Sequence, residues 1–326
     1  MILDITRHKF YEGLITLLVT TTIMVVLLAT SAGSSGLATA PDSPIMQLAT
    51  SATAGITFIQ GVVVVLCYFA SVFSMARATL RAHIYPIETM APMSLCAVMF
   101  LPMITTEDSM HQAIIMLLMT YGLANLFYCF GPKRRVKRLF AAMFSSGTLA
   151  LIDASLVVVP IVMMLALITA RKKLSEAIIV TTGMLLPMFI YCYVEWLLDV
   201  SFAQSLTAWW QSLTANLNLN ILDNITLTRL VYLAFVIFLQ AASIVLNIPH
   251  RDGRTSGARG VWNTLQLLFI VVLCAVLLLP SASESMLTAM IAIATAMLSV
   301  YFIHCNIMFS VVSFTALLSL AIAASL

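Results

Sequence analysis

A single carboxylate inside an apolar run is the residue of this chain best placed to do chemistry. Asp153 is the only charged residue in the 32-residue stretch 139–170, which has basic residues on both sides. An acid at membrane depth can bind a cation or act as a general acid or base. Alternatively, Asp153 caps the helix that follows it and stays at the outer surface. The sequence leaves both roles open.

Three further acids are candidates for catalysis. Glu195 and Asp199 are four positions apart, which places them on one face of a helix, within the aromatic stretch that begins at 191. Asp42 stands alone in the polar segment 32–53. The alternative is that outer loops depleted of Lys and Arg keep carboxylates by default, and that the aromatic residues form an interfacial belt.

Four other polar residues in apolar surroundings suggest binding. The amides of Gln60, Asn125 and Gln240 could line a polar path through the membrane, or could hold helices together by hydrogen bonds. Arg229 is the one basic residue predicted on the outer side, where it could meet an anionic group.

The Cys and His residues predict no metal site. No two of the six cysteines are closer than 29 residues, and no two histidines have the spacing of metal ligands. The sequence also contains no Gly-rich phosphate loop and no nucleophile elbow. We therefore expect no metal and no cofactor.

The composition indicates that lipid is the solvent of this chain. Of its 326 residues, 62% are hydrophobic and only 9% are charged, whereas a soluble domain has roughly 25% charged residues. The net charge of +3 is no signal for nucleic acid, because the basic residues are clustered in short loops. Apolar helices are predicted at 13–31, 55–75, 89–104, 111–130, 176–198, 227–248, 261–279, 286–302 and 306–324.

The stretch 139–170 decides the topology. One helix of that length would measure about 48 Å, whereas the hydrocarbon core is only about 30 Å thick. We therefore predict a short helical hairpin with its tip near Asp153. The result is an all-α, polytopic transmembrane helix bundle of about 11 membrane segments, forming one domain over 1–326.

The distribution of charge gives the predicted bundle an orientation. With a hairpin at 139–170, 15 of the 16 Lys and Arg residues fall on one side of the membrane and only Arg229 falls on the other. A single crossing would change that split to 10 and 6. The positive-inside rule therefore predicts a cytoplasmic N-terminus and a periplasmic or extracellular C-terminus. An uncharged amphipathic segment, about 200–225, is expected to lie on the outer interface.

The middle of the chain combines several sequence features. They are Leu-Ala-Asn-Leu-Phe at 123–127, a basic turn, Phe-Ser-Ser-Gly at 144–147, the apolar hairpin, and a helix with Gly183 and Pro187. In these features the chain resembles an uncharacterised family of bacterial inner-membrane proteins. In topology it is also similar to the C-type membrane glycosyltransferases and the envelope-glycan polymerases. Those enzymes usually carry an acidic motif in the first outer loop and a basic residue near the hairpin tip. Here Asp42 is alone and the tip, 152–155, is Ile-Asp-Ala-Ser.

The resemblance implies a role in the cell envelope, at the bacterial cytoplasmic membrane. We expect a non-enzymatic component of a membrane complex, with membrane lipid and other membrane subunits as partners and no nucleic acid. The alternative is a glycosyltransferase or glycan polymerase that acts on a lipid-linked glycan at the outer leaflet. A second alternative is a transporter, although the sequence shows no inverted repeat of the kind found in many transporters.

Overall fold

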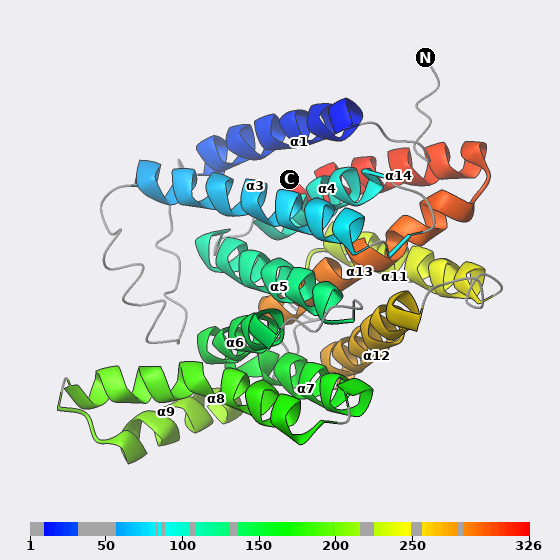
Figure 1. Ribbon diagram of the computed structural model, residues 1–326. Helices are drawn as coiled ribbons and strands as arrows, with labels where there is room; N and C mark the ends of the chain where they lie inside the picture. Colours follow the sequence, from blue (N-terminus) through cyan, green and yellow to red (C-terminus); the bar gives the residue numbers. More distant parts are fainter. Residues whose placement is uncertain are drawn as a thin grey trace.

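The computed structural model describes residues 10–31, 57–82, 84–85, 89–104, 109–130, 136–171, 173–197, 199–215, 225–248, 256–278 and 283–326. Over these ranges the secondary structure is helical, which confirms the predicted all-α class (Figure 1). The helices are α1 (Phe10–Ser31), α3 (Thr57–Arg81), α4 (Ala91–Ile104), α5 (Ser109–Cys129), α6 (Val136–Ile152), η3 (Ala154–Val157), α7 (Val158–Arg171), α8 (Leu174–Leu197), α9 (Phe202–Ala215), α11 (Leu227–Asn247), α12 (Ser256–Leu278), α13 (Glu284–His304) and α14 (Ile307–Ser325).

The described helices match the predicted segments closely and differ most where basic residues or glycines occur. Helix α3 continues six residues beyond its predicted end at 75, and α12 begins five residues before its predicted start at 261. The prediction followed apolar runs, but a helix does not have to end where the lipid does. Arg is a good helix former, so α3 extends through Arg77 to Arg81.

Helix α13 forms the centre of the bundle. Within its most apolar 18 residues, 94% are buried, and it packs against α4, α5, α11 and α12. Its small side chains, such as Ala292 and Ala296, let neighbouring backbones approach closely. All of α4 is buried as well, although its 14 residues span only about 21 Å. A helix enclosed by other helices does not have to cross the whole hydrocarbon layer itself.

Beside this centre, a row of helices packs in the order α3, α5, α6 and α8, and α5 also packs against α13 (Figure 1). The predicted break in the stretch 139–170 is confirmed. Helix α6 ends at Ile152, Asp153 is extended, and the chain continues through η3 into α7. Residues 139–170 therefore form two arms with Asp153 at the turn, and the first arm, α6, packs between α5 and α8.

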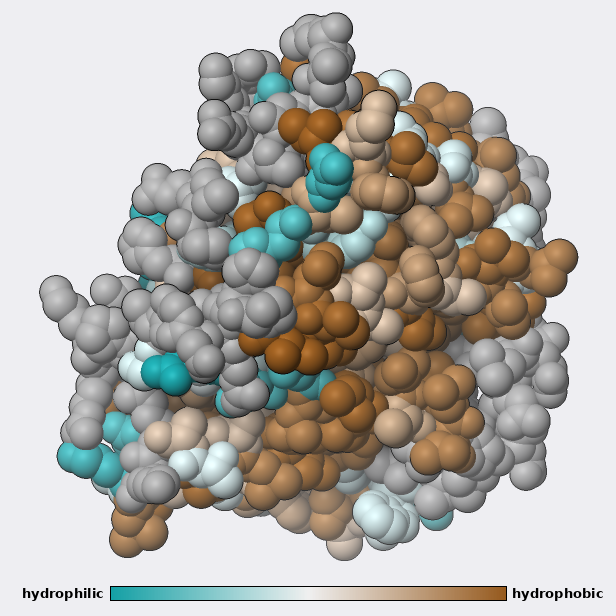
Figure 2. All heavy atoms as spheres, turned by 90° about the vertical axis from the view of Figure 1, so that its right-hand side faces the viewer, coloured by the Kyte–Doolittle hydropathy of each residue, from teal (hydrophilic) through white to brown (hydrophobic). Residues whose placement is uncertain are grey.

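The outer surfaces of the bundle are apolar. In both α8 and α14 only 22% of the most apolar 18 residues are buried, so large hydrophobic side chains face outward. On the face shown in Figure 2, hydrophobic side chains cover a broad area and hydrophilic ones gather toward one side. Such surfaces are stable in lipid and not in water. The chain is therefore a multi-pass membrane protein.

The structure does not support the predicted count of about 11 membrane segments. Seven of the described helices are long and apolar enough to cross a membrane: α3, α5, α8, α11, α12, α13 and α14. Three further apolar stretches, within α1, α4 and η3–α7, are shorter than a span requires, and α6 has only 17 residues. The prediction counted every apolar run as a crossing, but a short helix can be satisfied by packing inside the bundle.

Candidate functional site

Three arginines from two helices surround a cavity at one end of the bundle. Arg77 and Arg81 are one turn apart on α3 and share a face of that helix. Arg138 comes from the first turn of α6. Together with Ser74, Asn125 and Tyr128 they line a cavity of about 320 Å³ between α3, α5 and α6, which we call the basic cavity. This volume is within the range of roughly 300–1,000 Å³ that is typical of small-molecule sites.

The Arg138 side chain is held in a defined position. Its Nη1 donates a hydrogen bond to Asn125 Oδ1 over 2.9 Å, and its guanidinium carbon lies 5.1 Å from the centre of the Tyr128 ring. Asn125 Nδ2 in turn donates to the Tyr121 carbonyl over 2.9 Å, which fixes the amide orientation. Of the described residues that line the basic cavity, none is acidic. The arrangement can hold an anion but offers no carboxylate for acid–base chemistry.

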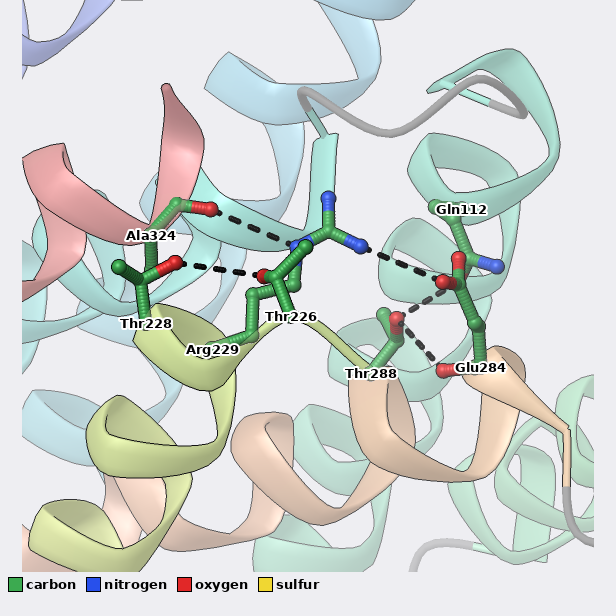
Figure 3. A network of polar contacts seen from close by, with 7 residues as sticks. All are labelled: Gln112, Thr226, Thr228, Arg229, Glu284, Thr288 and Ala324. Carbon is green, nitrogen blue, oxygen red and sulfur yellow. Dashed lines mark hydrogen bonds and ion pairs between the residues drawn. The ribbon is translucent and has the colours of Figure 1, made fainter. Parts of the chain in front are cut away.

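A second polar cluster lies at the opposite end of the bundle and joins three helices (Figure 3). Arg229 of α11 forms an ion pair with Glu284 of α13, with 3.3 Å between Nη1 and Oε1. Its Nε also donates to the Ala324 carbonyl of α14 over 3.4 Å. The two charged side chains are 20% and 43% exposed, so the pair itself contributes at most about 1 kcal/mol. Arg229 therefore connects helix ends, and its charge is balanced by Glu284.

A hydrogen bond between α5 and α13 lies beside this ion pair (Figure 3). Thr288 Oγ1 lies 2.6 Å from Gln112 Oε1, and both side chains are buried. Residues from α4, α5, α11 and α13 surround the narrow space between this bond and the ion pair. The whole cluster therefore joins the ends of neighbouring helices.

Asp153 caps the turn of the hairpin and binds a neighbouring helix. Its Oδ1 accepts a hydrogen bond from the Ser155 backbone N–H over 2.9 Å, which makes it the N-cap of η3. Its Oδ2 accepts from Ser283 Oγ, just before α13, over 2.8 Å. The Ser155 and Ser283 hydroxyls are 2.6 Å apart, so Ser155 donates to Ser283. Both carboxylate oxygens are therefore engaged: Oδ1 caps the turn, and Oδ2 holds the hairpin tip at the start of α13.

We predict that the amide variant of Asp153 separates capping from acid chemistry. Asp153→Asn keeps a side-chain oxygen for the cap, so its melting temperature in detergent should stay near that of the wild type. Asp153→Ala removes the cap and the bond to Ser283, which should lower the free energy of unfolding by about 1–2 kcal/mol. Equal destabilisation by both substitutions would contradict a capping role.

Glu195 and Asp199 do not share a helix face, which corrects the sequence prediction. Helix α8 ends at Leu197, and Asp199 adopts a left-handed conformation with a φ of 65°. The Val200 N–H donates to the Glu195 carbonyl and the Asp199 N–H to the Trp196 carbonyl, the two bonds of a Schellman motif. Asp is one of the few residues that adopts this conformation readily, so Asp199 ends the helix and does not pair with Glu195.

Glu195 instead holds α9 against α8. Its Oε2 accepts a hydrogen bond from the buried Ser205 hydroxyl over 3.1 Å. Ser201 and Gln204 bond reciprocally at the start of α9 and form a capping box, which explains why the helix begins there. Further along, Trp209 Nε1 donates to the Ala150 carbonyl of α6 over 3.0 Å.

Within the predicted amphipathic segment, about 200–225, the structure has a helix over Phe202–Ala215 that packs on α8 and η3, while its placement on the outer interface stays a prediction. Its large apolar side chains Phe202, Leu206 and Trp210 remain 45–61% exposed. Spaced four residues apart, they form one outward stripe, as expected for a helix that contacts lipid.

The three predicted binding amides are not assembled into one path. Asn125 lies in the basic cavity, opposite the second half of α3, where Arg77 is located. Gln60 lies 17 residues earlier on α3, about 25 Å away along the helix. Gln240 of α11 is fully buried, and neither of its amide atoms has a hydrogen-bond partner among the described residues. Asp42 lies outside the described residues.

The basic cavity was not predicted from the sequence, although its three arginines can be read there. Arg77, Arg81 and Arg138 were interpreted only as orientation signals, because each follows or precedes an apolar run. Their convergence depends on α3 and α6 both packing against α5.

The part of the chain that the structure describes contains no group of His, Cys, Asp or Glu suited to a metal. Comparison of the chain with protein-family models, curated proteins and solved structures gives no match, so its function is argued from these sites.

Proposed function

We propose that the chain is a component of a membrane assembly in the bacterial cell envelope and that it is not itself an enzyme. The observation that supports this proposal is the use made of the candidate acids. Asp153 holds the hairpin tip to η3 and to Ser283, and Glu195 holds α9 to α8. A catalytic acid or base needs a geometry open to a substrate, whereas these carboxylates are engaged with the protein.

The proposed location is the cytoplasmic membrane, with the basic end of the bundle in the cytoplasm. Arg77, Arg81 and Arg138 lie together at one end. Arg229 and Glu284 lie at the other end, near the hairpin tip. The positive-inside rule then supports a cytoplasmic N-terminus, an outer C-terminus and, with the short helices counted, about 11 segments.

The partners proposed are membrane lipid and other membrane subunits, in line with the resemblance to the uncharacterised bacterial inner-membrane family. The outward apolar faces of α8 and α14 are large enough to contact either. The glycosyltransferase and transporter hypotheses stay as predictions from the sequence, since neither gains a feature from the described residues. A lipid-linked glycan is a partner only under the glycosyltransferase hypothesis.

A complementation experiment tests the proposal. The gene is deleted, membrane assemblies are separated by native electrophoresis, and growth under envelope stress is scored. We expect the Asp153→Asn, Glu195→Gln double variant to restore the membrane assembly and the growth as fully as the wild type does. Loss of a catalytic carboxylate would instead lower activity by about 10²–10⁴-fold.

The control is Gly147→Val, a variant that is expected not to fold stably and that should therefore restore neither the membrane assembly nor growth. The proposal would be overturned by a double variant that is inserted at the wild-type level and melts at the wild-type temperature but fails to complement the deletion.

A further inference from the structure

The basic cavity concentrates positive charge beyond what orientation of the chain requires. Arg77, Arg81 and Arg138 reach it from α3 and α6, and no described lining residue is acidic. Positive-inside loops need only carry Lys and Arg near helix ends. They do not need to converge on a cavity of about 320 Å³, nor to have a guanidinium positioned by an amide and an aromatic ring.

The chemistry of the lining fits a phosphate group. A guanidinium binds phosphate through two parallel N–H···O bonds, and this geometry is strongest where the side chain is already positioned. Arg138 is positioned by Asn125 and Tyr128, whereas Arg77 is exposed on α3 and able to turn toward a ligand. Three positive charges suit a headgroup with at least two negative charges. A bound anion would also remove the mutual repulsion of the arginines.

An apolar stripe leads away from the basic cavity along α3. Phe73 lines the cavity, and Leu66, Val62 and Ile59 follow it at intervals of seven, four and three residues, which keeps all four on one helix face. Their side chains are 38–62% exposed. The stripe extends about 21 Å from residue 73 to residue 59, enough for a lipid tail in one leaflet.

We propose that the basic cavity binds the phosphate-bearing headgroup of an anionic membrane lipid, with the lipid tail along the exposed stripe of α3. The orientation proposed above is used only to assign this site to the cytoplasmic leaflet. The binding itself does not depend on that orientation or on membership of an assembly, so the two proposals can fail separately.

Lipid binding to the purified full chain in detergent, followed by native mass spectrometry, tests the proposal. The probes are dioleoyl phosphatidate and, as the zwitterionic reference, dioleoyl phosphatidylcholine. We expect the wild type to prefer phosphatidate by about tenfold or more, and the Arg77→Gln, Arg81→Gln variant to lose that preference. Arg138→Lys keeps the positive charge but loses the paired N–H donors of the guanidinium and its contact with the Tyr128 ring. It should therefore retain only part of the preference for phosphatidate.

Two control variants make these results specific. Arg259→Gln removes a basic residue of α12 that does not line the basic cavity and should leave the preference unchanged. Melting temperatures of all variants confirm that each is folded. An Arg77→Gln, Arg81→Gln protein that is folded and prefers phosphatidate as strongly as the wild type would overturn the assignment of the site.

A second arm separates a lipid from a soluble phosphate compound. Leu66→Asn alters the exposed stripe and should weaken phosphatidate binding several-fold, while Ile178→Asn, at a similarly exposed position of α8, should not. Inorganic diphosphate serves as the soluble probe. If diphosphate displaces phosphatidate and Leu66→Asn has no effect, the site takes a soluble phosphate and the lipid assignment is wrong.

Discussion

Gly147→Val is expected to prevent stable folding of the bundle. Gly147 lies where α6 crosses α8, and a Cβ at this position would overlap the Met184 carbonyl oxygen. The Met184 carbonyl carbon and Cα would also lie only 3.1 and 3.2 Å away. These are backbone atoms, so they cannot move aside as the end of a flexible side chain could. Close approach through small residues is a common way for helices to associate in membranes.

Both sides of α6 depend on this kind of contact, which makes the expected effect large. Gly183 of α8 packs against Phe140 and Met143, and Gly122 of α5 packs against Ser145. Separating α6 from α8 would therefore disturb the row from α3 to α8. We expect a loss of about 3 kcal/mol or more, the upper end for overpacking.

The measurement is the yield of monodisperse protein in detergent and its melting temperature. The matched control is Gly61→Ala on α3, where nothing lies within 4 Å of an added Cβ. That change should be neutral or stabilising by up to about 1 kcal/mol, because Ala favours helix more than Gly does. If Gly147→Val melts at the wild-type temperature, the α6–α8 crossing is not as close as described.

Tyr68→Ala is expected to have the next largest effect on stability. Tyr68 of α3 is fully buried, and its hydroxyl donates to the Ala97 carbonyl of α4 over 2.7 Å. The same hydroxyl lies 2.8 Å from Thr20 Oγ1 of α1, in a hydrogen bond. One side chain therefore joins three helices at a site that neither lipid nor water reaches.

A graded series divides this effect into its parts. Tyr68→Phe keeps the ring and should lower the free energy of unfolding by only about 1 kcal/mol, because Thr20 can still donate to the Thr16 carbonyl. Tyr68→Ala also leaves a cavity the size of an aromatic ring, for which we expect about 3–5 kcal/mol. Burial from lipid provides little hydrophobic driving force, so lost packing accounts for most of this difference.

Thermal unfolding in detergent measures the series, and Tyr193→Ala is the control. Tyr193 is 57% exposed on α8, so its truncation should change the free energy of unfolding by less than about 0.5 kcal/mol. Equal melting temperatures for Tyr68→Phe and Tyr68→Ala would show that the ring itself contributes no packing energy.

Much of the fold could be predicted because the constraints on it are local. A helix satisfies its own backbone hydrogen bonds, so an apolar run in lipid has one stable conformation whatever its neighbours are. The hairpin at 139–170 followed from its length, since one helix there would exceed the hydrocarbon thickness, and from the distribution of Lys and Arg.

The end of α8 at Asp199 and the role of α4 could not be predicted in the same way. Asp199 was placed on a helix face by its spacing from Glu195, but a left-handed residue ends the helix before that spacing can apply. Whether α4 crosses the membrane depends on the helices that enclose it, which its own 14 residues do not specify. In both cases packing or helix termination decides the outcome, and the apolar pattern alone does not.

The sequence by itself determined that this protein is a helical membrane protein with a hairpin around Asp153. The physical reason is that an apolar segment in lipid must satisfy its own backbone hydrogen bonds, which a helix does. Only the tertiary structure decided what the polar residues do. Asp153 holds a neighbouring helix because Ser283, 130 positions away, donates to its carboxylate, and Glu195 holds α9 through Ser205 of that next helix. Arg77 and Arg138, 61 positions apart, became one basic cavity because α3 and α6 both pack on α5. Contacts between helices depend on which helix faces pack together, and this is determined by the packing of the whole bundle.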